Sequence, residues 1–112
     1  MIELKVIDHA DQQFGMIFNG KRVTMRLRYN TTSDRWSYDL AMDDQWIVQG
    51  KRLVSMVDLF RSFPNLDLGV LFVYPATVGA EPDRHGLPDR LVRLYHATDA
   101  EVEEALETPD VY

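Results

Sequence analysis

The dipeptide Asn19-Gly20 constrains the fold of this chain more than any other feature of its sequence. It separates two segments, 14–18 and 21–29, in which apolar and polar side chains alternate at every second position. Both central residues of a tight type I′ turn need a positive φ, which Asn and Gly adopt at little cost. The pattern therefore predicts a β-hairpin, and pairing Phe18 with Lys21 places the apolar residues of both strands on one face.

A third strand is predicted to follow the hairpin. Turn-forming residues occupy positions 30–34, and apolar side chains then recur at every second position. If Tyr29 pairs with Trp36, the apolar residues of this strand join those of the hairpin, and Arg26 lies opposite Asp39 on the other face. The sequence therefore predicts an antiparallel sheet with one apolar face and one charged face.

A fourth strand is expected after a turn at residues 43–45. This turn is expected to bring Met42 opposite Trp46 and Leu40 opposite Val48. Four successive strands would then form a meander that buries one face.

The second half of the chain has a less regular pattern. Residues 53–60 are rich in apolar side chains without a clear period, so a short strand and one or two helical turns both remain open. Residues 70–74 are continuously apolar. They predict a strand that is either covered on both faces or placed in a subunit interface.

A long loop and one more strand precede the tail. The loop, 75–89, is rich in Gly and Pro, and loops of this length are usually functional or mobile. The strand is expected over residues 90–95, with Leu91 and either Leu94 or Tyr95 facing inward.

Charge divides the chain into a neutral body and an acidic tail. Residues 1–96 hold 12 acidic and 12 basic side chains, whereas residues 97–112 hold six acidic side chains and no Lys or Arg. Thr98 and Glu101 fit a capping box, which predicts a short helix that ends before Pro109. We therefore expect a mainly β domain over 1–96, a small antiparallel β-barrel or sandwich of about six or seven strands, and a helical tail over 97–112.

Composition limits the class of protein further. The chain of 112 residues fits one compact domain, and the absence of Cys excludes disulfides and thiolate metal sites. The first residues include Glu3 and lack the continuous apolar stretch of a signal peptide. The longest apolar run, 70–74, is far shorter than the roughly 20 residues of a transmembrane helix. We expect a soluble protein made in the cytoplasm, with no membrane partner.

No pattern of reactive side chains points to catalysis. His9, His85 and His96 lie in separate segments without metal-ligand spacing, so a surface or turn position is expected for each of them. The tripeptide Asp83-Arg84-His85 lies in the long loop, but no nucleophile elbow or phosphate-binding loop accompanies it. We therefore expect no enzyme, no metal site and no cofactor.

Charged side chains suggest instead that the chain contacts a protein partner. Arg26 and Arg28 alternate out of phase with Trp36 and Tyr38, so bases and aromatic rings occupy opposite faces and form no stacking platform for RNA. The acidic tail is either a solvated helix or a segment that steers onto a basic partner. The candidate partner-binding residues are Arg26, Arg28, Lys51, Arg52, Arg84, Glu101, Glu103 and Glu104.

The order of these segments resembles the small baseplate plug proteins of contractile-tailed bacteriophages, the family represented by the baseplate plug of a cyanophage. The resemblance begins at the hairpin with its arginine-rich strand and covers roughly residues 14–96. It leaves the tail and the contacts of the long loop unassigned. Its further motifs are a tryptophan strand that ends in Asp39-Leu40, the step Gly50-Lys51-Arg52-Leu53 and the step Val57-Asp58-Leu59.

The resemblance implies a non-enzymatic virion protein of the tail baseplate, synthesised in the cytoplasm of the bacterial host. Its implied partners are the baseplate hub, the tail-tube initiator or tube proteins, and the spike, with several copies in a symmetric assembly. Its implied role is to help close the central tube and assemble the baseplate. The alternative is a small single-stranded nucleic-acid-binding β-barrel, against which the neutral body and acidic tail argue. A small-molecule-binding or enzymatic barrel is a third hypothesis.

Overall fold

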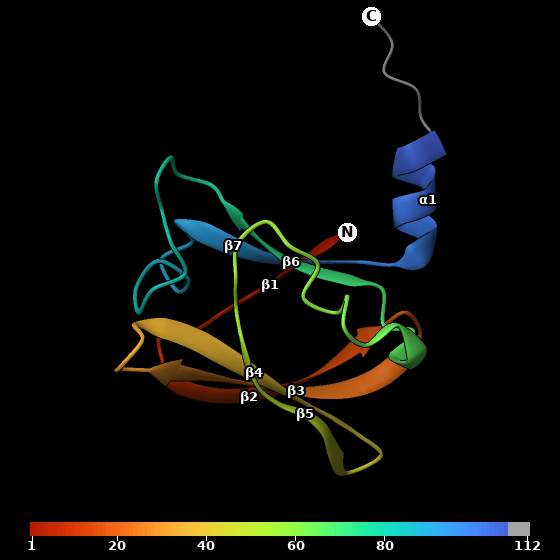
Figure 1. Cartoon of the computed structure of the whole chain (residues 1–112), viewed down its shortest axis with the longest axis horizontal. Helices are drawn as coiled ribbons and strands as arrows, with labels where there is room; N and C mark the ends of the chain where they lie inside the picture. The colour runs from red at the N-terminus through yellow and green to blue at the C-terminus, as the bar shows by residue number, and fades with distance from the viewer. Residues whose placement is uncertain (108–112) are drawn as a thin grey trace, which may run out of the picture.

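The computed structural model describes residues 1–107, which form two antiparallel sheets that face each other without closing into a barrel (Figure 1). The four-stranded sheet consists, in spatial order, of β2 (Asp11–Phe18), β3 (Lys21–Asn30), β4 (Arg35–Met42) and β5 (Gln45–Arg52). The three-stranded sheet consists of β1 (Ile2–Leu4), β7 (Val92–Ala97) and β6 (Val70–Pro75). A 3-10 turn (Pro64–Leu66) and the helix α1 (Asp99–Glu107) complete the fold. The prediction of a mainly β fold of about six or seven strands is confirmed, in its sandwich form.

The predicted meander is confirmed in strand order, and its predicted register is confirmed for the pairs β2–β3 and β3–β4. Asn19 and Gly20 both have a positive φ, 56° and 82°, and form the turn between β2 and β3. Since side chains alternate between the two faces, this register directs the apolar set to the core and the charged set to the outer face of the sheet. The predicted pairs that occur are Phe18 with Lys21, Tyr29 with Trp36, Arg26 with Asp39 and Leu40 with Val48.

The turn between β4 and β5 is shorter than predicted. Its residues Asp43 and Asp44 both have a positive φ, 51° and 62°, so the turn has two central residues. Met42 therefore pairs with Gln45, and the predicted pairing of Met42 with Trp46 is wrong. A β-bulge farther along the pair takes up the extra residue of β5.

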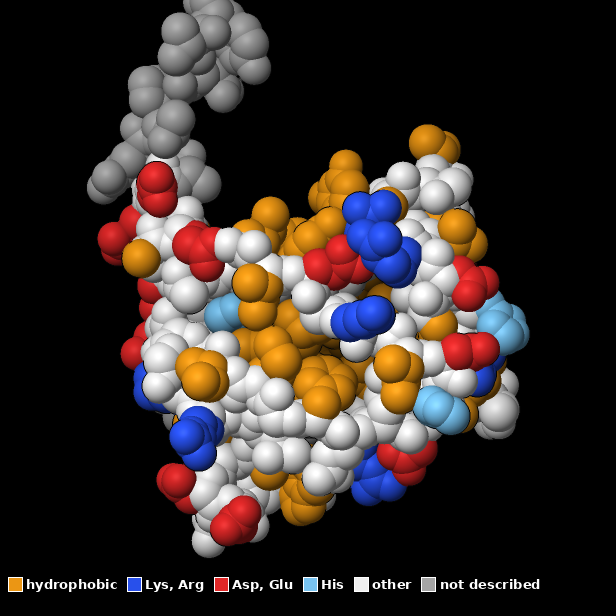
Figure 2. Space-filling model, turned by 180° about the vertical axis from the view of Figure 1, so that it is seen from behind, with side chains coloured by type: hydrophobic (Ala, Val, Ile, Leu, Met, Phe, Trp, Pro, Cys, Tyr) orange, Lys and Arg blue, Asp and Glu red, His pale blue; other side chains and the backbone are white. Residues whose placement is uncertain are grey.

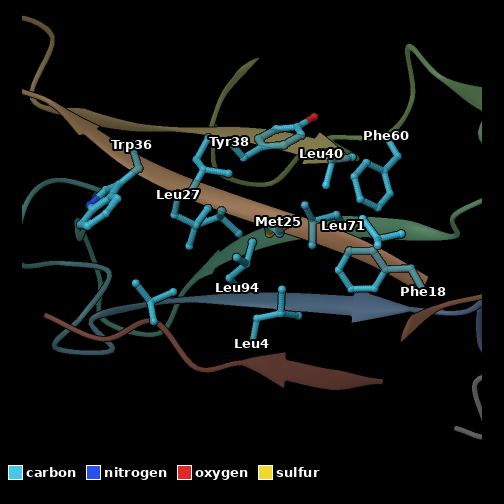
Figure 3. Close-up of a cluster of buried hydrophobic side chains, with 14 of the residues drawn as sticks. Leu4, Phe18, Met25, Leu27, Trp36, Tyr38, Leu40, Phe60, Leu71 and Leu94 are labelled. Carbon is cyan, nitrogen blue, oxygen red and sulfur yellow. The ribbon is translucent and has the colours of Figure 1, made fainter. Parts of the chain in front are cut away.

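The core lies between the two sheets and extends along their full length (Figure 3). Trp36 lies at one end of the cluster and Phe18 at the other, and both are fully buried. Burying one such side chain contributes about 1.5–3 kcal/mol to stability. The central residues drawn from both sheets are Leu4, Met25, Leu27, Tyr38, Leu40, Leu71 and Leu94.

Residues 53–60 form neither the strand nor the helix that the sequence left open. They run as turns along β6, where Ser55 makes a single parallel bridge with Val73. The amides of Met56 and Leu59 donate to carbonyl oxygens of β6 at 2.8 and 2.7 Å. This segment crosses in front of the sandwich in Figure 1 and closes that side with its own main chain.

The strand β6 buries only one of its faces within the chain. Leu71 and Val73 are buried, whereas Tyr74 is exposed, so coverage on both faces is wrong for the single chain. The alternative, that this strand lies in a subunit interface, stays a prediction. Phe72 packs on its neighbour Tyr95 with ring centroids 5.6 Å apart.

The last strand of the sandwich begins later than predicted. Leu91 is exposed and belongs to the loop, where its amide donates to the carbonyl of Gly86 at 2.9 Å, so its predicted inward position is wrong. β7 begins at Val92, and the inward position predicted for Leu94 is confirmed. The edge strand β1, which the sequence did not predict, pairs with β7.

His96 is buried, and its predicted surface position is wrong. Alternation along β7 directs it inward, where its ring stacks on Phe18 at a centroid distance of 4.2 Å. Nε2 lies 2.6 Å from the carbonyl oxygen of Leu68, so the ring must donate a proton there. Burial lowers the pKa of His96 below its usual 6.5, although the bond to Leu68 opposes this shift.

The capping box predicted for the tail helix is confirmed. The amide of Glu101 donates to Oγ1 of Thr98 at 3.2 Å, and the amide of Thr98 donates to Oε1 of Glu101 at 3.1 Å. These two bonds satisfy main-chain donors at the start of α1. The predicted stop at Pro109 lies outside the described residues.

The free energy of unfolding is expected to fall when the pH is lowered from about 7.5 to about 5. Because the pKa of His96 is lowered on folding, the unfolded chain binds more protons below pH 6.5, and stability is lost through that window. Chemical denaturation at each pH measures the effect. The variant His96→Gln should have a smaller slope in this window; an unchanged slope would assign the effect to other groups.

Candidate partner-binding surfaces

Two arginine–carboxylate pairs lie on the outer face of the four-stranded sheet. Arg26 reaches Asp11 with two bonds, Nε to Oδ1 at 2.9 Å and Nη2 to Oδ2 at 2.6 Å. The bonds from Arg26 hold the pKa of Asp11 below its usual value. Arg28 reaches Asp39, with Nη2 2.8 Å from Oδ2. Each arginine thus bonds diagonally across the sheet, since Arg26 is directly opposite Asp39 in the register.

Asp39 is the buried member of this surface, with only 4% of its side chain exposed. Its Oδ1 accepts a bond of 2.6 Å from the amide of Gly50, and its Oδ2 pairs with Arg28. One carboxylate therefore ties β3, β4 and β5 together at the irregular β4–β5 pair.

A polar groove of 540 Å³ crosses β3, β4 and β5 beside these pairs. Three residues that lie side by side on neighbouring strands line this groove together: Arg28 of β3, Ser37 of β4 and Arg52 of β5. Arg35 also lines the groove and forms an ion pair with Glu81 of the long loop. The structure thus brings together Arg28 and Arg52, two of the residues predicted for partner binding.

Lys51 and Arg84 lie apart from the groove. Nζ of Lys51 is 5.5 Å from the ring centroid of Phe63, and the residue is exposed on the edge strand β5. Arg84 pairs with Asp8 at 2.7 Å and lies over the ring of Trp36 at 5.7 Å. The contacts of Arg84 therefore fasten the long loop to the end of the sandwich.

The three acidic candidates of the tail have different surroundings. Glu101 caps the helix and forms an ion pair with the N-terminal amine of Met1, so it fastens α1 to β1. Glu103 and Glu104 are exposed on the helix. Of the predicted residues, the exposed ones are Lys51, Arg52, Glu103 and Glu104.

Sequence reasoning missed a polar cluster at the base of the helix. The side-chain amide of Asn19 donates through Nδ2 to Asp67 Oδ1 at 3.1 Å and to Asp99 Oδ2 at 3.0 Å. Lys21 pairs with Asp67 at 2.9 Å and lowers the pKa of that carboxyl. The hairpin turn therefore also fixes the direction of the helix, a role that the sequence signals nowhere because these residues are far apart in the chain.

The described part of the chain, residues 1–107, has no group of three or more His, Asp or Glu side chains placed to hold a metal ion. No helix within these residues is long and apolar enough to cross a bilayer.

The chain is therefore a small β-sandwich whose outer face carries ion pairs and a polar groove. Residues 1–99 match the family model described as "Cyanophage baseplate Pam3 plug gp18". The match covers most of the chain, which therefore belongs to this family of baseplate plugs. The resemblance drawn from the sequence is confirmed, and the match begins earlier, at residue 1. Family membership supports a structural role in the phage tail baseplate. No curated protein matches the chain.

Replacing Asp39 is expected to destabilise the sandwich far more than replacing Asp11. Asp39→Ala leaves the amide of Gly50 without its acceptor and Arg28 without its partner, at a cost of about 1–3 kcal/mol. Asp39→Asn keeps an acceptor for Gly50 and should cost less. Urea denaturation measures both, with Asp11→Ala as the exposed control. Equal losses for the two alanine variants would contradict the role given to burial.

Proposed function

We propose that this plug protein closes the central tube at the baseplate and takes part in baseplate assembly, with several copies packed against the hub and the tube or tube-initiator proteins. The observation that carries the proposal is the family match over residues 1–99. A plug must present stable surfaces, and the two packed sheets with their fastened loops supply them. The spike is a further partner expected at this place in the tail.

The charge distribution of the chain supports two kinds of contact. Arg28, Arg35 and Arg52 line the groove on the four-stranded sheet, which suits an acidic surface of a partner. The helix α1 projects away from both sheets in Figure 1 and carries Glu103 and Glu104 exposed. A projecting acidic helix suits a basic surface, and complementary charge mainly accelerates and orients association.

Co-expression with the hub, tube-initiator, tube and spike proteins tests this function. Affinity pull-down followed by light scattering should yield a complex of defined mass and stoichiometry with the hub or a tube protein. A chain that stays monomeric and binds none of the four partners would contradict the proposal. The next experiment would then be a salt titration with single-stranded nucleic acid, because phosphate binding weakens steeply with salt.

Removing the tail is expected to leave the sandwich folded and to weaken partner binding. A chain that ends at Thr98 keeps the pairing of Ala97 with Val70, so its melting temperature should stay close to that of the full chain. Pull-down should recover much less of it with the partners. Normal recovery of the shortened chain would exclude the tail as a docking segment.

Reversing one charge on the helix tests whether the charge of α1, and not only its shape, contributes to partner binding. Glu103→Lys should weaken the complex about tenfold at low salt and less at high salt. Asp89→Lys, an equal change at an exposed position of the loop before β7, is the matched control and should have little effect. An equal loss of binding affinity for both variants would show that the net charge of the chain, and not the helix, determines the effect.

A further inference from the structure

One side of the sandwich is left open at its edge strands. β1 and β2 are edge strands of the two sheets and lie toward the back of the molecule in Figure 1. Figure 2 shows that face with hydrophobic side chains gathered in a central hollow. A hollow of 720 Å³ along the β2 edge is lined by Ile2 of β1 and by Met16 and Ile17 of β2. It continues onto the outer face of the four-stranded sheet, where Arg22, Asp43 and Asp44 also line it. Ile2 and Ile17 are 47% and 61% exposed, so apolar surface meets water here.

The opposite side of the sandwich is covered by a segment of the same chain. There, residues 53–60 add main-chain bonds to the edge of β6 and bury Leu53 and Phe60 between the sheets. No described segment of the chain pairs with the free edge of β2. Among the described residues, the open side therefore has an unpaired edge and a partly apolar lining without a cover from the same chain.

The edge of β2 lacks the features that normally prevent strand addition. Its eight residues contain no Pro and no Lys, and their only charged side chain is Asp11. Every second residue of an edge strand directs its amide and carbonyl away from the sheet. Edges of this length and composition readily pair with a strand from another chain.

Gly15 in the middle of β2 has no conformational reason to be glycine. Its φ is not positive, and a Cβ added to it would meet no atom within 4 Å. A glycine inside a strand weakens the strand, and it often marks a place where another chain approaches closely. Gly15 thus leaves an open space on the outer face beside Ile17.

The other edge of the same sheet, β5, has the complementary features. Seven of its eight residues are exposed, among them Trp46 at 42% and Ile47 at 39%. Its only charged side chains, Lys51 and Arg52, are both basic. β5 is therefore a second free edge, with apolar side chains toward one end and positive charge at the other.

The sheet register aligns these complementary features. Gly15 and Trp46 belong to one row across the sheet, through Thr24 and Ala41. Asp11 and Arg52 belong to another row, through Arg28 and Ser37. Because successive strands are antiparallel, β2 and β5 also run antiparallel. A second copy displaced sideways along the sheet, without stagger, sets its Trp46 beside Gly15 and its Arg52 beside Asp11. β5 has two more residues between these positions than β2, and bulges take them up in this contact as they do in its pairing with β4.

We propose that copies of this chain associate head to tail, with β5 of one copy added to the β2 edge of the next. Main-chain bonds extend the sheet across the contact, and the Trp46 ring covers the space at Gly15. The contact uses a different surface on each copy, so it generates a ring or an open chain instead of a two-fold dimer. The inference rests on the proposed function in one respect, that the plug acts in several copies.

A two-fold pairing of β2 with β2 fits the same edge less well. Centred on Phe14, it sets Asp11 of each copy beside Ile17 of the other and leaves Trp46 outside the contact. A charge then faces an apolar side chain, whereas the head-to-tail contact matches opposite charges and covers the glycine. The observations therefore favour a second copy presenting β5.

Mixing two single-edge variants tests the proposal. Ile17→Lys places a charge on the β2 edge, and Trp46→Lys does the same on the β5 edge. Sedimentation of the purified full chain from about 10 to about 500 µM should show species larger than a dimer. Each variant alone should lose this association by about tenfold or more in dissociation constant. An equimolar mixture should form a one-to-one heterodimer through the two intact edges.

A control variant on a loop away from both edges accompanies this test. Val78→Lys, at a fully exposed position of the loop between β6 and β7, makes the same kind of change and should associate like the native chain. Thermal melts check that each variant is folded. A native chain that stays monomeric, or that stops at a dimer insensitive to Trp46→Lys, overturns the head-to-tail contact. Recovery of the native chain with the hub in pull-down would then leave the proposed function standing.

Discussion

The apolar face of the β2–β5 meander can leave water only by packing against β6 and β7, and the rest of the structure depends on this contact. The chain crosses between the sheets after β1 and again after β5. Buried side chains of the meander fix the second crossing and the loop between β6 and β7. The hydroxyl of Tyr38 donates to the carbonyl of Leu59 at 2.7 Å, and its burial raises the pKa of Tyr38 to about 12. The indole of Trp36 donates to the carbonyl of Asp83 at 2.8 Å. Core residues therefore also position the loops, because an unpaired buried donor is costly.

The parts of the fold that the sequence predicted are those decided by neighbouring residues. Alternation and the Asn19-Gly20 turn determine the register of three strands, because a slip of one residue would expose the whole apolar set. The β4–β5 turn was predicted one residue too long, since Asp43 and Asp44 are compatible with more than one turn. His96 was placed on the surface because its burial depends on Phe18, which lies far away in the chain. The charged candidates were recognisable by type, but the partners of Arg84 and the ion pair of Glu101 with Met1 arise only from tertiary structure.

The chain covers one side of the sandwich and leaves the other side uncovered, and this difference bears on how the protein contacts other chains. Residues 53–60 close one side at the cost of an irregular segment that the sequence pattern could not classify. The other side keeps the β2 edge unpaired and Ile17 exposed. Edge strands usually carry Lys, Pro or a covering segment, because an unprotected edge pairs with other chains. In a protein of a baseplate family, an unprotected edge is better explained as a contact surface than as a defect.

The polar and apolar surfaces contribute differently to an assembly. Exposed ion pairs such as Arg26 with Asp11 contribute little to stability and are screened by salt. In the proposed contacts, the outer charges therefore serve mainly to orient the partners. In the proposed head-to-tail contact, affinity must then come from the apolar area and main-chain bonds of the β2 and β5 edges. Because Asp11 and Arg52 lie at the same end of the sheet, a copy that pairs in the wrong direction loses the charge match. In the proposed contact, these charges add little energy but select one direction of association, which an assembly that closes around an axis requires.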